Sequence, residues 1–297
     1  MPGMLNYCPT HSKRMLGKNA LQAFLWGFLL FPIALQAGHI EKTFPVAAQP
    51  NLILKSQSGW ITIRGWQRQE IRIVATNFSN NVEIDIENNN SKVSVNTHVL
   101  DQLASPDKVK VDYQVFVPEK SNVEVNTQLG GVLIEGISGE IRVDVFQAAV
   151  KIMGVSGFVN AKTLNSKLEV LDSKGTIQTK TVTGDIWLIH LESNSVSAES
   201  TVGNILYDSP FFSRGSYSFS TNDGWIRILC REQDSVELNA RTIHGKIQSD
   251  LPILSKKHSP LRLNNVGLQS LLGTLNSGDA TIRITTFNGL IQILKKP

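Results

Sequence analysis

Apolar residues return at regular intervals through the middle of this chain. From Gly130 a nine-residue unit runs seven times without a gap, as GGVLIEGIS, GEIRVDVFQ, AAVKIMGVS, GFVNAKTLN, SKLEVLDSK, GTIQTKTVT and GDIWLIHLE. The first position is always small, the third is always Val, Ile or Leu, and the fifth is mostly apolar. Positions three and five share one face of an extended strand, and the mostly polar fourth position faces the other way. The pattern predicts short strands with one buried and one solvated face.

The eighth position of the unit is also apolar, with a single exception at Ser173. Its occupants are Ile137, Phe146, Val155, Leu164, Ser173, Val182 and Leu191. The small first residue suits a turn that needs a positive φ or a close approach of two backbones. A nine-residue unit is too short to bury its own apolar face, so neighbouring units must stack. Stacked short units are the principle of a β-solenoid.

The length of one coil is left open by the spacing of the glycines. After the seven units a Thr-x-x-Gly-x-Ile motif continues, and its glycines Gly184, Gly203, Gly224 and Gly245 lie 19, 21 and 21 residues apart. A coil of about 18–21 residues with two short strands explains both the unit of nine and its doubling. A three-sided coil of 27 residues also fits, because Gly130, Gly157 and Gly184 have that spacing.

The two ends of the chain depart from the repeat. Residues 38–118 carry alternating strands with a turn at Asn88–Asn90, which predicts a β-meander that caps the stack. Residues 119–297 form the repeat region, and the two regions are compatible with one continuous domain. Residues 253–280 break the pattern and are expected to form a loop before a final strand pair. No segment carries the apolar stripe of a helix, so the predicted fold class is all-β.

Residues 1–37 have the composition of a secretory signal peptide. Lys13, Arg14 and Lys18 precede an apolar run over residues 20–35, and small residues follow at 37 and 38. A transmembrane anchor is the alternative, but the run is shorter than the roughly 20 residues that span a bilayer. We expect cleavage near Ala37 and a mature chain without a transmembrane helix. The mature protein is then exported, to the periplasm, the cell surface or the medium.

Removal of this leader changes the charge and the cysteine content. Three of the 29 Lys and Arg residues lie in the leader, so the mature chain has 26 basic and 25 acidic residues. A net charge near zero gives no reason to expect a nucleic-acid partner. Cys8 leaves with the leader, and Cys230 then has no partner for a disulfide. Cys230 alternates with Ile226 and Ile228, which predicts a thiol in the core.

Three segments resemble a known bacterial family. Ser58-Gly59-Trp60-Ile61-x-Ile63-x-Gly65-Trp66 opens the pattern, the Thr-x-x-Gly-x-Ile units continue it, and Ile284-Thr285-Thr286-Phe287-Asn288-Gly289-Leu290-Ile291-x-Ile293 closes it. Together they resemble the "putative adhesin" family of exported β-strand repeat proteins, the DUF4097 type, over about residues 42–295. The resemblance implies a β-solenoid-like fold at the cell envelope, and it carries no catalytic residues.

Metal ligands and catalytic groups find little support in the sequence. A calcium-binding roll needs an aspartate at one fixed turn position, whereas Asp144, Asp172 and Asp185 fall at positions six, seven and two of the unit. The histidines lack the spacing of a zinc site. Asp208, Glu232, Asp234 and Glu237 form a modest acidic group that a glycosidase could use only if two carboxylates converged. We therefore expect no metal, no cofactor and no enzymatic activity.

Aromatic residues are the candidate ligand-binding positions. Trp60, Phe158 and Trp225 each follow a repeat glycine, and Trp187 occupies an outward fourth position. Exposed aromatic rings can stack on sugar rings, although the same residues could shield turns or contact the cap. The leading hypothesis is a non-enzymatic envelope scaffold that binds an envelope glycan or protein. The alternatives are a purely structural assembly component and a β-helix carbohydrate-active enzyme.

Overall fold

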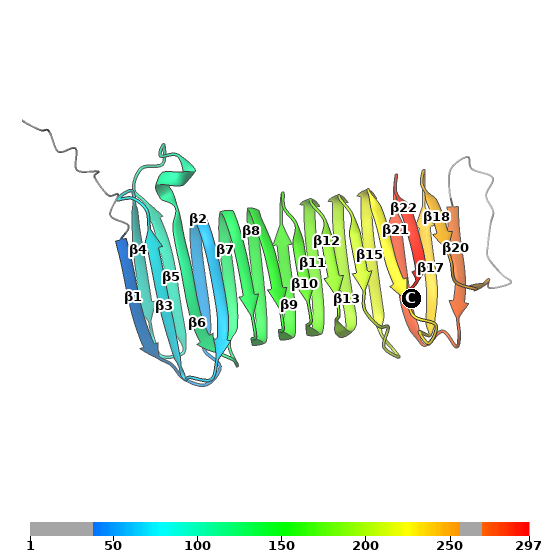
Figure 1. Ribbon diagram of the computed structural model, residues 1–297, viewed down its shortest axis with the longest axis horizontal. Helices are drawn as coiled ribbons and strands as arrows, with labels where there is room; N and C mark the ends of the chain where they lie inside the picture. Colours follow the sequence, from blue (N-terminus) through cyan, green and yellow to red (C-terminus); the bar gives the residue numbers. More distant parts are fainter. Residues whose placement is uncertain (1–37, 256–268, 297) are drawn as a thin grey trace, which may run out of the picture. The chain divides into compact units, whose positions relative to one another are not determined.

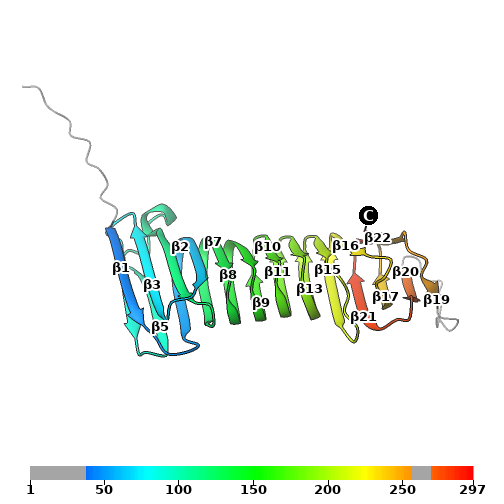
Figure 2. The same ribbon diagram turned by 60° about the horizontal axis from the view of Figure 1, so that its bottom comes forward.

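The computed structural model describes residues 38–255 and 269–296 of the chain. Nearly all of the regular structure is β-strand, and the described residues contain one short 3₁₀ turn, Pro106–Val109. Figures 1 and 2 show the strands lying side by side in a stack. The fold is therefore all-β, as the alternating pattern predicts. The predicted signal peptide lies outside the described residues. None of the described helices is long and apolar enough to cross a membrane.

Each complete coil contains two strands, one on each side of a shared core. On one side, Val123, Ile141, Val159 and Ile177 are in register in consecutive parallel strands, and they lie 18 residues apart in the sequence. On the other side, Val150, Leu168 and Ile186 are in register at the same interval. The two-strand coil is therefore correct, and the three-sided alternative is excluded.

We call the two sides of the solenoid side A and side B. Side A contains, in stack order, β4 (Val82–Asn88), β5 (Lys92–Val99), the first halves of β2 (Asn51–Trp66), β7 (Asn122–Glu135) and β8 (Ser138–Met153), then β9 (Ser156–Thr163), β11 (Lys174–Thr183), β13 (Glu192–Val202), β15 (Ser216–Asp223), β21 (Ala280–Thr286), β17 (Val236–Thr242), β20 (Gln269–Leu275) and β19 (Leu254–Ser255).

Side B follows the same order with shorter strands. It contains β1 (Gly38–Pro45), β3 (Glu70–Asn77), β6 (Val111–Pro118), the second halves of β2, β7 and β8, then β10 (Leu168–Leu171), β12 (Ile186–Ile189), β14 (Ile205–Asp208), β16 (Trp225–Cys230), β22 (Leu290–Lys295) and β18 (Lys246–Ser249).

The core lies between the two sides and consists mainly of the third and fifth positions of the repeat. All seven third-position residues are buried, and Thr179 is the buried polar occupant of the fifth position. One apolar cluster runs from Val46 to Ile293 without a break between the cap and the repeats. Cys230 belongs to this cluster, which confirms the predicted core thiol. Burial is thus shared between neighbouring coils, as stacking requires.

The glycines of the Thr-x-x-Gly-x-Ile motif allow adjacent coils to approach closely. Gly224 has a φ of +137°, and a Cβ atom there would lie 2.2 Å from the carbonyl oxygen of Gly203 in the next coil. The threonine of the motif is buried and faces the same junction, since the Thr221 hydroxyl donates to that carbonyl oxygen at 2.9 Å. The motif therefore serves the stacking of the coils.

The last coil is inserted between two coils that precede it in the sequence. Strands β21 and β22 pair with β15 and β16 on one edge and with β17 and β18 on the other. Strand β20 then pairs antiparallel with β17 and covers it. The prediction of a loop over 253–280 is therefore wrong for residues 254–255, 269–275 and 280, which lie in β19, β20 and β21, and residues 256–268 lie outside the described ranges. The final strand pair is present as predicted.

The N-terminal end is capped by antiparallel pairs. Strands β5 and β6 form a coil beside β2, β4 pairs antiparallel with β5, and β3 and β1 continue side B beyond β6. The turn at Asn88–Asn90 connects β4 to β5, with Asn90 at a φ of 66°. The meander thus stacks directly on the first repeat coils. Contacts group the described residues, 38–255 and 269–296, into one compact unit.

Candidate binding surface

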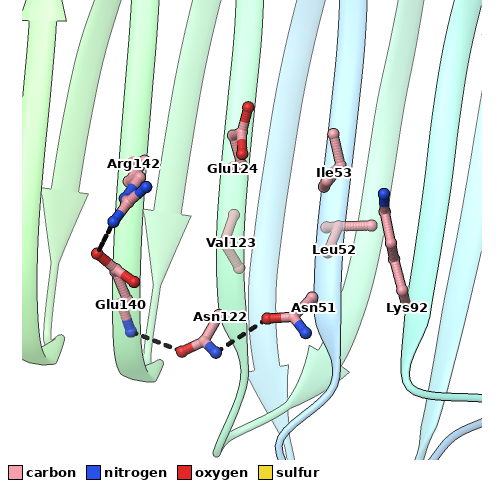
Figure 3. A pocket seen from close by; sticks show the side chains of 9 residues that line it. All are labelled: Asn51, Leu52, Ile53, Lys92, Asn122, Val123, Glu124, Glu140 and Arg142. Carbon is pink, nitrogen blue, oxygen red and sulfur yellow. Dashed lines mark hydrogen bonds and ion pairs between the residues drawn. The ribbon is translucent and has the colours of Figure 1, made fainter.

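A polar hollow of about 290 Å³ lies on the outer face of side A, near the start of β2, β7 and β8 (Figure 3). The Asn122 amide donates to the Asn51 side-chain oxygen at 2.9 Å and accepts from the Glu140 backbone N–H at 2.9 Å. Glu140 in turn pairs with the Arg142 guanidinium. These groups are hydrogen-bonded to one another across three strands. Four of the lining residues therefore form one hydrogen-bonded chain, and Lys92 and Glu124 line the hollow beside it.

The three candidate tryptophans lie on the outer face of side B. Trp60 and Trp225 occupy one row of outward positions, and Trp187 occupies the next row. The coil of Trp187 is the fourth along the stack after that of Trp60, and the coil of Trp225 is the second after that of Trp187. At about 4.8 Å per strand, the coils of Trp187 and Trp225 are about 10 Å apart. The fold therefore brings the three rings to a common side.

Trp60 is the most exposed of the three rings. Its side chain is 56% exposed, and its ring lies over Gly131 of the next coil, where an added Cβ would come within 2.2 Å of a ring carbon. Its backbone N–H donates to the Asp112 carboxylate at 2.8 Å. The backbone is therefore anchored while the ring covers a flat, glycine-lined strip. A ring held this way keeps one face open to solvent.

Trp225 and Trp187 are partly buried, and each has a cation beside its ring. The Arg227 guanidinium lies 4.8 Å from the centroid of Trp225, and the Lys167 ammonium lies 3.1 Å from that of Trp187. The Trp187 indole N–H is buried without a hydrogen-bond partner among the described residues. These contacts orient both rings through cation–π attraction.

Phe158 lies apart from the tryptophans, on the outer face of side A. It occupies the row of Glu140 and Thr176 and is partly buried. Phe158 and Trp60 both follow a repeat glycine, but they lie on opposite sides of the solenoid, because alternate nine-residue units belong to opposite sides. The structure therefore places three of the four candidate aromatics on one side of the solenoid, with the coil of Trp60 about 19 Å along the stack from that of Trp187.

The acidic group in the C-terminal half is divided among separate contacts. Asp208 ends the side B strand β14 and pairs with Lys296, whereas Glu237 lies on the side A strand β17. The Lys295 ammonium pairs with Glu232 and lowers the pKa of that carboxyl. Asp234 is buried and accepts from the backbone N–H of Arg231 at 2.7 Å. In the described part of the chain, no three His, Cys, Asp or Glu side chains are arranged to hold a metal ion.

The eighth position of the repeat has two roles that the sequence does not separate. In the side B units the residues at this position, such as Ile137 and Leu191, are buried. In the side A units Phe146 and Val182 are 49% and 38% exposed, at the corner where the chain turns from side A to side B. The sequence shows the eighth position as a regular row of apolar residues, but this regularity does not tell which of these residues face the core and which face solvent.

These features define the chain as a β-solenoid-like repeat protein. Residues 47–294 match the family described as Toastrack DUF4097, and the chain belongs to this family. The match confirms the resemblance that the sequence motifs indicate. None of the curated proteins compared with this sequence matches it.

Solved structures with low sequence identity were also found. One is named as a "putative cell adhesion protein" from Clostridium sporogenes ATCC 15579, with 11% identity, a TM-score of 0.28, and coverage of 88% of this chain and 100% of that chain. Another is named as a "putative adhesin" from Bacteroides fragilis NCTC 9343, with 12% identity, a TM-score of 0.40, and coverage of 87% and 97%.

Proposed function

We propose that this protein is a non-enzymatic, exported scaffold that binds an envelope glycan or an envelope protein through the outer face of side B. The observation that carries the proposal is the exposure of Trp60 in the same row as Trp225, with Trp187 in the adjacent row. A large apolar side chain gains little for folding when half of it faces water. Rings fixed on a rigid sheet can bind a partner with little loss of conformational entropy.

A glycan chain is the ligand that this arrangement fits best. The rings lie along the stack, so a linear polymer could contact more than one ring. The Arg227 guanidinium, which uses Nε and one terminal nitrogen on Gln292, could donate from its other nitrogen to sugar hydroxyl groups beside Trp225. Contacts that are weak singly become significant when several act on one polymer.

The test compares Trp60→Ala and Trp225→Ala in cosedimentation with purified peptidoglycan. We expect each variant to bind between about twofold and tenfold more weakly. Phe158→Ala is the matched control, because it removes an aromatic ring from side A. Unchanged binding by both tryptophan variants with intact folding would refute the glycan proposal. If the tryptophan variants bind peptidoglycan as the parent does but no longer capture an envelope protein that the parent captures, the partner is a protein.

Export is the part of the proposal that rests on the sequence of residues 1–37. N-terminal sequencing of the protein recovered from envelope fractions should find a start near Gly38. Recovery of a chain that begins at Met1 or Met15 would contradict cleavage of the leader.

An assembly role has less support, because the ends of the stack carry features that discourage strand addition. Lys42 occupies the core-facing row of the edge strand β1, between Ile40 and Phe44. The Gln269 side chain accepts from the backbone N–H of Ile247 in the edge strand β18. An inward charge and a capped N–H both oppose pairing with another strand.

A further inference from the structure

Apolar side chains gather in two groups along the corner where the coils turn from side A to side B. We call this set the corner ridge. It consists of Phe146, Leu164 and Val182 in three consecutive coils and of Phe287 and Ile243 in two more, with Thr201 and Asn222 in the same row between the two groups. Four of the ten large apolar side chains that are exposed among the described residues belong to it. The ridge spans the coils from β8 to β17, about 29 Å at 4.8 Å per strand.

The side chains of the corner ridge lie outside the core, although Phe287 packs edge-on against His244. Phe287 is 45% exposed, Phe146 is 49% exposed, and the core beneath is filled by other residues. The backbone at the corner is already paired between coils, as in the bonds from Asn165 N–H to Phe146 C=O and from His244 N–H to Phe287 C=O. A partner therefore cannot add a strand at this corner. It can only contact side chains.

Cationic side chains follow the ridge on the side A flank. A hollow of about 500 Å³ is lined by Phe146, Leu164 and Val182 together with the ammonium groups of Lys55, Lys162 and Lys180. Lys180 pairs with Glu199, whereas Lys55 and Lys162 form no ion pair with any described residue. Asp144 is the one carboxylate in this lining. Asp144 lies opposite Lys162 on the adjacent strand, so three ammonium groups face one carboxylate in this lining. An excess of positive charge beside apolar groups favours an amphiphilic, anionic partner.

We propose that the corner ridge docks the solenoid onto the surface of an anionic lipid bilayer. The apolar side chains would enter the boundary between headgroups and acyl chains, and Lys55 and Lys162 would contact anionic headgroups. A rigid protein partner fits less well, because a stable interface buries about 800 Å² on each partner and two groups of side chains along one corner offer a narrow strip. A bilayer is deformable, so each side chain can insert independently.

The inference is independent of the glycan-binding proposal, which uses the outer face of side B. Its test uses the chain from Gly38 to Pro297, which contains the entire described core. The probes are vesicles of phosphatidylcholine alone and of equal parts phosphatidylcholine and phosphatidylglycerol. We expect cosedimentation with the anionic vesicles, weakening as salt is added.

The variants separate the apolar and charged contributions. Phe146→Ser and Phe287→Ser should each weaken binding roughly tenfold, and Lys162→Glu should weaken it at least roughly fivefold. The matched control is Phe212→Ser, because Phe212 is 38% exposed in the loop that leads from side B back to side A. Thermal melts of all variants should match that of the parent.

Three outcomes would overturn the proposal. The first is absence of binding to anionic vesicles by the parent chain. The second is an equal loss of binding in Phe212→Ser, which would show that any exposed phenylalanine contributes. The third is a concentration-dependent dimer in sedimentation that Phe146→Ser abolishes, which would assign the ridge to a second copy of the chain.

Discussion

The hydroxyl of Thr221 donates a 2.9 Å hydrogen bond to the carbonyl oxygen of Gly203 in the neighbouring coil. Thr181 lies two coils away in the same row, yet its hydroxyl is buried without a hydrogen-bond partner among the described residues. Both threonines belong to the same Thr-x-x-Gly-x-Ile motif. The same motif position therefore has a hydrogen bond that compensates burial of the hydroxyl at Thr221 and no such bond at Thr181.

This difference predicts opposite effects of one substitution at the two sites. Thr221→Val removes a satisfied hydroxyl and leaves the Gly203 carbonyl without this donor, so it should cost about 1 kcal/mol of unfolding free energy. Thr181→Val removes an unsatisfied hydroxyl and should be neutral or stabilising. Urea unfolding of the two variants measures both values. Equal destabilisation by the two changes would show that the hydrogen bond is not the cause.

The glycines provide a second pair of matched sites. Gly175 has a φ of +106°, and a Cβ there would lie 2.0 Å from the carbonyl oxygen of Gly157. Gly136 has a φ of +66°, with nothing within 4 Å of the position of its Cβ. Gly136→Ala should cost about 1–2 kcal/mol through backbone strain alone, whereas Gly175→Ala must also separate two coils and should cost more. Thermal melts that rank the two variants in the reverse order would contradict the close approach of the coils.

Much of this fold follows from the repeat, because each coil carries the same small, apolar and polar positions. The two-strand coil, the core rows such as that of Ile141, and the buried Cys230 were all accessible in the sequence. The insertion of β21 and β22 was not, because the motif at Gly289 is the same as that at Gly245. Because the coils share one motif, the motif does not specify which coils are adjacent. The order of the last coils in the stack therefore depends on the tertiary packing of the end strands.

The candidate surface could be predicted only in part for the same reason. The sequence identifies Trp60, Trp187 and Trp225 as candidate outward aromatics, but units of nine alternate between two sides, so the same pattern also includes Phe158. The outward rows also differ in character, since side B carries Leu133, Leu206 and other apolar residues where side A is mainly polar. The exposure of the eighth position in the side A units could not be recognised, because the same position in the side B units is also mostly apolar and is buried.

Disruption of one core position should spread along the stack. Ile141 is fully buried and lies between Val123 and Val159 of the adjacent coils. Ile141→Asp loses the burial of an isoleucine, worth about 1.5–3 kcal/mol, and buries an unpaired carboxylate in addition. Arg142→Asp changes the neighbouring exposed position and is the control. Protection of amide hydrogens from exchange should fall in several coils for Ile141→Asp, and a loss confined to β8 would argue against coupling between coils.

Stability should fall at alkaline pH because buried acidic groups retain their protons in the folded chain. Burial, followed by the nearby Asp234 carboxylate, raises the pKa of Cys230 from 9.0 to about 12. Burial also raises the pKa of Tyr113 from 10.0 to about 12, against the opposing hydrogen bond with Thr97. Between pH 9 and pH 12 the folded chain then binds more protons than the unfolded chain, so the unfolding free energy decreases as pH rises. For Cys230 alone the loss between pH 9 and pH 11 is about 2–3 kcal/mol.

The cysteine contribution can be isolated, because Cys230 is the one cysteine of the described residues. Urea midpoints measured from pH 8 to pH 11 should fall for the parent and fall less steeply for Cys230→Ala. A thiol reagent at pH 8 should react with Cys230 only in urea, because the native thiol is both protonated and buried. Rapid labelling of the native protein, or an unchanged pH slope in Cys230→Ala, would show that this thiol is exposed in solution and does not contribute to the alkaline loss.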